Sequence, residues 1–148
     1  MNKTKINLND NLILKSENIE YNDDTLKKHL DEETIVSGSN SNGTYMKFPD
    51  GTMICTSIRN FSNVSVSSTW GSLYDSPSLD LGDFSQTFID IPKVFITSHN
   101  TEKSSSKACF IEWVSNTTKS NWGQTAVARP TSGSINLTID LLAIGRWK

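Results

Sequence analysis

A strict alternation of apolar and polar residues near the C-terminus constrains the fold more than any other feature of the sequence. The apolar members are Ile135, Leu137, Ile139 and Leu141, and the polar members are Asn136, Thr138 and Asp140. A period of two places all the apolar side chains on one face of a β-strand, whereas a helix would scatter them. From Leu142 to Ile144 both faces turn apolar, which predicts that this end of the strand meets a second surface, either another sheet or another subunit.

Further strand-like segments precede this one and are separated by turn-forming residues. The pair 44–48 and 52–58 flanks Pro49-Asp50-Gly51, a tight-turn sequence, and predicts a β-hairpin. The other expected strands are 64–70, 84–91, 93–99, 107–115 and 124–128, with a loop at 71–83. Ser, Thr and Asn number 21, 15 and 14, together 50 of 148 residues, and their side chains compete with helical hydrogen bonds. The sequence therefore predicts an all-β fold, an antiparallel β-sandwich or barrel, of which we expect the sandwich.

The N-terminal part differs from this pattern. Residues 1–36 contain 5 Lys and 8 Asp or Glu, and read as a connector with one short helix over 22–33. Asn22 or Asp23 would cap that helix, and Leu26 and Leu30 would share one of its faces. A helix of about ten residues is unstable alone, so it needs the head domain or sister chains to pack against, unless it is a surface helix on a monomer. Residues 37–43 read as a flexible Ser/Gly/Asn linker, and residues 44–148 as the β-sandwich head domain.

Several function classes are disfavoured by composition and by missing motifs. The net charge of −2 is unsuited to binding nucleic acid. No apolar run approaches the length of a membrane span, and the N-terminus lacks the apolar core of a secretory signal. No catalytic motif and no His/Cys spacing for a metal is present, so we expect neither an enzyme nor a cofactor or metal. Cys55 and Cys109 lie in expected strands and read as two free buried thiols, with a single disulfide as the alternative.

Aromatic residues near polar loops form the candidate binding site. Indole and phenol faces can cover the apolar C–H faces of a sugar, while amides, carboxylates and guanidinium groups bind its hydroxyls, so loops at one end of a rigid β-scaffold can form a shallow saccharide site. The alternative is that each Trp is a core or interface anchor. The candidate saccharide-binding residues are Trp122, Trp113, Asn121, Gln124, Tyr74, Trp70, His99, Asn100 and Arg129.

Four segments of the sequence resemble a known group. Residues 42–55 (NGTYMKFPDGTMIC) resemble the opening of the C-terminal head domain of bacteriophage tail fibre and receptor-binding proteins. Residues 88–94 (FIDIPKV) and 143–148 (AIGRWK) are similar to later motifs of that group, and residues 19–30 resemble its neck segments. The half from Phe84 onward also resembles the H-type lectin sandwich, although this chain has Lys107 where that family places a sugar-contacting Arg.

The resemblance implies a homotrimer that displays its head on a virion tail after assembly in the host cytoplasm. The head would bind a bacterial cell-surface glycan without catalysis, and several weak sites would act together through avidity. We expect the trimer contacts at Leu26, Leu30, Leu142 and Ile144. The alternative is a structural tail or baseplate protein that contacts another virion protein through its N-terminal segment.

Overall fold

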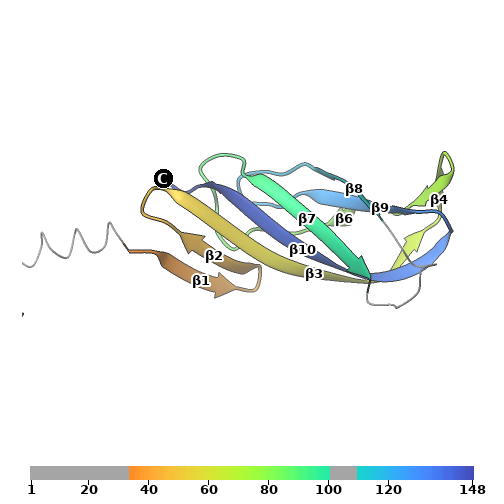
Figure 1. The fold of residues 1–148 in the computed structure, drawn as a ribbon, viewed down its shortest axis with the longest axis horizontal. Helices are drawn as coiled ribbons and strands as arrows, with labels where there is room; N and C mark the ends of the chain where they lie inside the picture. The colour runs from red at the N-terminus through yellow and green to blue at the C-terminus, as the bar shows by residue number, and fades with distance from the viewer. Residues whose placement is uncertain (1–33, 101–109) are drawn as a thin grey trace, which may run out of the picture. The chain divides into compact units, whose positions relative to one another are not determined.

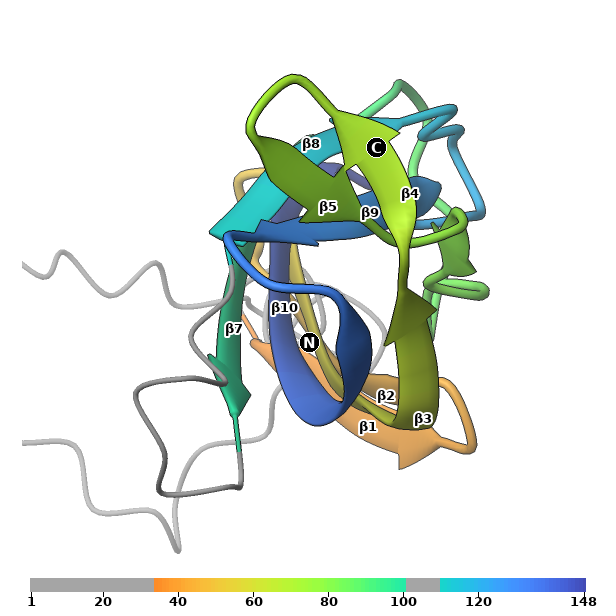
Figure 2. The same ribbon diagram turned by 90° about the vertical axis from the view of Figure 1, so that its right-hand side faces the viewer.

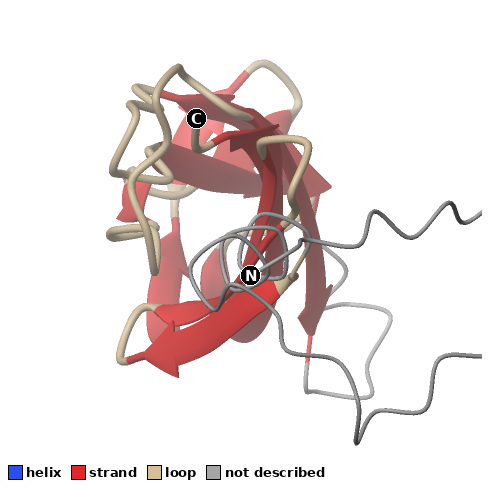
Figure 3. Cartoon of the chain, turned by 90° about the vertical axis from the view of Figure 1, so that its left-hand side faces the viewer, coloured by secondary structure: helices blue, strands red, loops and turns tan. Residues whose placement is uncertain are grey.

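The computed structural model describes residues 34–100 and 110–148, which form strands, turns and loops (Figures 1 and 3). The chain divides into two compact units, residues 1–33 and residues 34–148. The expected helix over 22–33, with Leu26 and Leu30, lies outside the described residues. So does Cys109.

The described residues form two antiparallel sheets, seen as two layers in Figure 2. The first, here called the long sheet, has the order β1-β2-β3-β10-β7. In the second, here called the short sheet, β9 pairs with β5, β6 and β8, and β4 pairs with β5. The long sheet comprises β1 (Val36–Asn40), β2 (Gly43–Lys47), β3 (Thr52–Val66), β7 (Lys93–Asn100) and β10 (Gly133–Arg146). The short sheet comprises β4 (Ser68–Trp70), β5 (Leu73–Asp75), β6 (Leu79–Asp80), β8 (Phe110–Ser115) and β9 (Gln124–Arg129). The predicted all-β sandwich is confirmed.

The core lies between the sheets and is built from alternate residues of the long strands. The predicted inward face of β10 is confirmed, because its apolar members are at most 3% exposed. Two aromatic side chains from the loop before β7 complete the core, and the rings of Phe84 and Phe88 pack edge to face with centroids 5.0 Å apart. Cys55 is a buried free thiol in this core, as expected.

The predicted hairpin between 44 and 58 is confirmed as β2 and β3. The Phe48 amide donates to the Thr52 carbonyl over 2.8 Å, and the Gly51 amide donates to the Phe48 carbonyl over 3.0 Å. Gly51 has φ of 89°, a conformation that favours glycine.

The expected flexible linker at 37–43 is wrong, because most of it is the edge strand β1 paired with β2. Gly38 lies against the Tyr45 ring, where a Cβ would come within 2.6 Å of the phenol oxygen. The Asn40 side chain donates to the Ser85 carbonyl over 2.9 Å. Small polar residues therefore form this strand because partner strands fix them, and the compact unit begins at Thr34 rather than at 44.

Two other expectations are wrong in the region 71–91. The expected loop at 71–83 contains the short strands β5 and β6. The expected strand at 84–91 is irregular, and its aromatic residues act as core anchors four positions apart. The Phe88 amide bonds the carbonyl of Lys119, in another loop, over 2.9 Å, so loop contacts replace a strand ladder.

Candidate functional site

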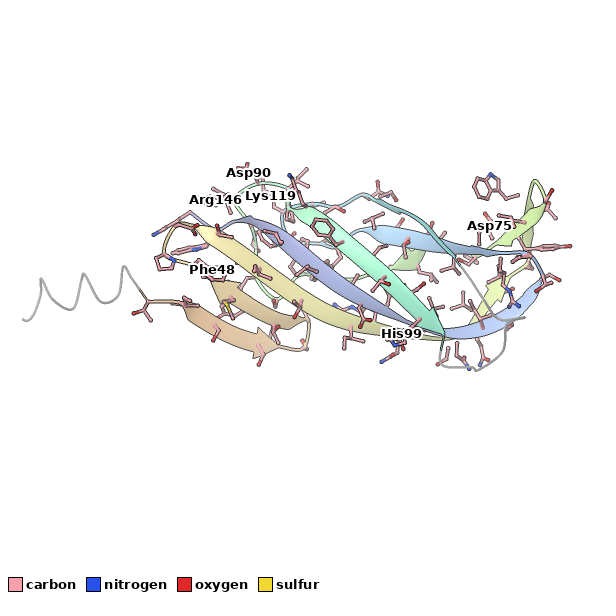
Figure 4. The ribbon with its side chains drawn as sticks, viewed as in Figure 1. Phe48, Asp75, Asp90, His99, Lys119 and Arg146 are labelled. Carbon is pink, nitrogen blue, oxygen red and sulfur yellow. The ribbon has the colours of Figure 1, made fainter. Side chains whose placement is uncertain are left out.

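The β4–β5 hairpin presents a strongly exposed tryptophan. Trp70 is 57% exposed at the end of β4 and precedes Gly71, whose φ of 60° allows the tight turn into β5. In Figure 1 this hairpin lies at the end of the sandwich opposite β1 and the C-terminus. Figure 4 shows the same separation, with Asp75 at one end and Phe48 and Arg146 at the other.

The pairing register places a polar group beside this indole. Ser68 pairs with Asp75, and Trp70 pairs with Leu73, so all four side chains project from one face of the hairpin. Trp70 and Asp75 are diagonal neighbours, a relation that separates Cα atoms by about 7–8 Å. Asp75 Oδ1 is buried and has no hydrogen-bond partner among the described residues. An aromatic ring and a carboxylate therefore lie on the same face of this tip.

Tyr74 and Arg129 support the tip from the opposite face. They pair across β5 and β9, and Tyr74 also pairs with Thr69 of β4. Arg129 is 3% exposed and donates from Nη2 to the Thr131 hydroxyl over 3.0 Å, while Tyr74 packs against the core. These two predicted site residues thus form the base of the hairpin rather than its exposed surface.

Trp122, a candidate saccharide-binding residue, does not face solvent. Its side chain is 0% exposed, and its ring centroid lies 4.4 Å from that of Phe84. The Trp122 amide donates to the Gly82 carbonyl over 2.9 Å, which fixes the loop so that the indole fills the core. Trp122 is the core anchor that the alternative reading described, and it cannot contact a saccharide in this structure.

The neighbours of Trp122 hold loops together. The Asn121 side-chain Nδ2 donates to Asp83 Oδ1 over 3.0 Å, and its side-chain Oδ1 accepts from the Gly123 backbone amide over 2.7 Å. Gln124 begins β9 and pairs with Asp80 and Ser115. Lys119 of the same loop lies at the end of the sandwich opposite Asp75 (Figure 4), so the predicted site residues do not form one constellation.

The remaining predicted residues lie elsewhere. His99 is on the outward face of the long sheet, where its Nδ1 lies 3.2 Å from Asp140 Oδ2. Asn100 ends β7, and Trp113 belongs to β8. The side chains of Asn100 and Trp113 are outside the described part of the structure.

Sequence reasoning missed Asp75 and Ser68 as members of this site. Both lie in a segment rich in Ser, Asp and Gly that lacks a long alternation, so the strands of three residues gave little signal. Among the described residues, no three His, Cys, Asp or Glu side chains gather closely enough to hold a metal ion. The described part also contains no helix long and apolar enough to cross a membrane.

Comparison with known proteins gives two structural likenesses. An N-truncated R1-type pyocin tail fiber has a TM-score of 0.51 and 17% sequence identity, covering 86% of this chain and 99% of that one. A C-terminal fragment of the P. aeruginosa R1 pyocin fiber has a TM-score of 0.46 and 19% identity, and the match spans 76% of this chain but 28% of the fragment.

No family model and no curated protein matches the sequence. The H-type lectin likeness stays a prediction. The described residues have the fold of the N-truncated pyocin tail fiber, which confirms for the fold the tail-fibre resemblance seen in the sequence.

Proposed function

We propose that this chain is the receptor-binding head of a virion tail fibre, which attaches the particle to a bacterial cell-surface saccharide by binding without catalysis. The observation that carries the proposal is the exposed Trp70 beside Asp75 on the hairpin farthest from β1. The likeness in fold to a tail fiber supports a role in attachment. The tip of a fibre must present its binding surface at the end away from the particle that carries it.

The chemistry of the tip fits a weak sugar contact. The Trp70 indole offers an apolar ring face, and the partly exposed Asp75 lies on the same face of the hairpin. A carboxylate oxygen can accept hydrogen bonds from sugar hydroxyls. A single shallow contact of this kind binds weakly, so the proposal includes a homotrimer and avidity on a multi-copy tail.

The test is retention of the full chain on an array of bacterial wall and surface polysaccharides. We expect Trp70→Ala and Asp75→Ala to abolish the array signal, and Trp70→Phe to keep part of it. Ile91→Ala is the matched control, because Ile91 is 65% exposed and lies outside the hairpin. Equal retention by Trp70→Ala and Ile91→Ala would remove the hairpin from the site.

The same preparation separates binding from other functions. Release of reducing ends from a bound polysaccharide would show a depolymerase and contradict the proposal. Absence of any array signal, together with co-purification of a virion protein that is lost on deleting residues 1–33, would favour the structural tail or baseplate role.

A further inference from the structure

The outward face of the long sheet carries apolar side chains where a solvated sheet normally has polar ones. On β3 and β10, the buried residues alternate with outward positions that include Ile54, Ile58, Leu142 and Ile144. The neighbouring strands add Met46 from β2 and Phe95 from β7. We call this set the apolar face: Met46, Ile54, Ile58, Phe95, Leu142 and Ile144.

The members of the apolar face occupy neighbouring positions in the register, with Ile58 paired to Asp140 and diagonal to Leu142. Ile144 pairs with Ile54, which pairs with Met46, and Leu142 pairs with Phe95. Ile58 is 61% exposed and Phe95 is 54% exposed. Grooves between them are lined by Met46, Ile54 and Thr56 and by Phe95, Asp140 and Leu142. A contiguous apolar patch of this kind marks a surface that another surface covers.

We propose that the apolar face packs against the same sheet of other copies of this chain, with Ile58 and Phe95 at the contact. The inference rests on the proposed homotrimeric fibre, and it extends the predicted contacts at Leu142 and Ile144 to four strands.

Charge supports an identical partner. Between the Ile54–Ile144 pair and the Asn60–Thr138 pair, the outward positions of β2, β3, β7 and β10 hold three titratable groups, Lys93, His99 and Asp140. His99 and Asp140 pair with each other at 3.2 Å. Lys93 and Asp140 carry opposite formal charges, so identical faces would not bring together a large charge of one sign. Depletion of charge is typical of interface cores.

The area of the apolar face also favours partner copies that are already held together by another part of the chain. Four strands about 4.8 Å apart and seven positions about 3.4 Å apart give a patch of roughly 450 Å². A stable interface between separate proteins needs about 800 Å² from each partner. A free partner would therefore bind this face weakly, whereas copies joined through residues 1–33 meet it at high effective concentration. The order of the chain is consistent with this, because the N-terminal segment is followed directly by β1 of the long sheet, which begins at Val36.

The test compares charged substitutions in the full chain by light scattering and sedimentation. Lysine in a covered face leaves a buried unpaired charge, so Ile58→Lys and Phe95→Lys should raise the dissociation constant about tenfold or more. Ile91→Lys is the matched control, since Ile91 is 65% exposed and off the face. Retention of the oligomer by both face variants, at the same dilutions as Ile91→Lys, would overturn the proposal.

A second measurement does not depend on a charged variant folding. In a Cys109→Ser background, maleimide should label Ile58→Cys about tenfold more slowly than Ile91→Cys in the oligomer, because covered side chains exclude the reagent. Equal rates would contradict the proposal. Protection of Ile58→Cys in a monomeric chain would contradict it too, since residues 1–33 of the same chain would then cover the face.

The two proposals fail separately. If the polysaccharide array gives no signal but the apolar face is protected from maleimide, the saccharide site is contradicted and the contact between copies is supported. Rapid labelling of the apolar face together with unchanged polysaccharide retention would contradict only the proposed contact between copies of the chain.

Discussion

The indole Nε1 of Trp147 donates a hydrogen bond to the carbonyl oxygen of Phe48 over 3.0 Å, across 99 residues of chain. The Trp147 amide also donates to the Gly51 carbonyl over 3.0 Å. The ammonium groups of Lys47 and Lys148 lie 5.4 and 5.0 Å from the centre of the same indole. Two of the motifs that carry the tail-fibre resemblance, at 42–55 and 143–148, therefore form one structural unit that joins the end of β10 to the β2–β3 hairpin.

Trp147→Phe tests this fastening. It removes the indole donor and keeps an aromatic ring, and the Phe48 carbonyl still accepts from Gly51. We expect the free energy of unfolding to fall by about 1 kcal/mol, the net value of one hydrogen bond. Denaturant unfolding measures it, with Trp70→Phe on the exposed hairpin as the control that should change little. An unchanged midpoint for Trp147→Phe would show that the bond contributes no stability.

Gly51→Ala should lower the free energy of unfolding more than Gly71→Ala does. Gly51 lies in the turn of the β2–β3 hairpin, and Gly71 lies in the β4–β5 turn. At Gly51, φ is 89° and a Cβ would lie 2.6 Å from Arg146 Nη2 and 3.0 Å from the Lys148 carbonyl oxygen. We expect a loss of about 2–3 kcal/mol there. At Gly71, φ is 60° and no atom lies within 4 Å of the Cβ position, so the loss should be about 1 kcal/mol. Equal losses in thermal unfolding would argue against the contact with Arg146.

Asp50 should make the hairpin turn sensitive to acid. Hydrogen bonds from the Thr52 amide and hydroxyl, over 2.8 and 3.0 Å, hold the pKa of the Asp50 carboxyl below its usual range. Because the folded-state pKa is the lower one, the carboxylate stabilises the fold above about pH 4, and this contribution is lost as pH falls through the folded-state pKa. Wild type should unfold at a higher temperature than Asp50→Asn at pH 7.

As the pH falls below the folded-state pKa the difference between the two should vanish, since the carboxyl is then protonated in both the folded and unfolded states. Asp90→Asn is the control, because Asp90 lies at the surface with Lys119 3.9 Å away, a pair of small energetic value. A gap between wild type and Asp50→Asn that stays constant from pH 7 to pH 2 would show that the charge of Asp50 has no part in it.

Cys55 should be unreactive while the chain is folded. Burial raises the pKa of the Cys55 thiol, and the side chain is 0% exposed. Thiolate is the reactive form, so both effects slow alkylation. In a Cys109→Ser chain, maleimide at neutral pH should label Cys55 only after denaturant is added. Rapid labelling of the native chain would mean that the core opens locally around β3.

Trp122 and Trp70 should give opposite results. Removing the fully buried Trp122 ring leaves a core cavity, so Trp122→Ala should lower the free energy of unfolding by about 3–5 kcal/mol. Trp70→Ala changes an exposed side chain and should stay within about 0.5 kcal/mol of wild type. Denaturant unfolding separates them. A stable Trp122→Ala chain would contradict its place in the core.

The sequence by itself determined the class of the fold and its longest strands. The alternation at Ile135–Leu141 and the turn at Pro49–Gly51 are local signals, because strand period and turn geometry depend on neighbouring residues. Both are confirmed by β10 and by the β2–β3 hairpin. The prediction that Leu142 and Ile144 meet a second surface stays a prediction, because Ile144 is 37% exposed in the single chain.

Only the tertiary structure decided which similar residues are inside and which are outside. Trp122 and Trp70 both adjoin polar loop sequences, yet one is 0% and the other 57% exposed. The difference arises because Phe84, 38 positions earlier, packs against Trp122, and nothing in the local sequence encodes that contact. Residues 37–40 likewise become a strand only because β2 lies beside them. Burial and strand pairing depend on distant segments, and packing overrides local propensity there.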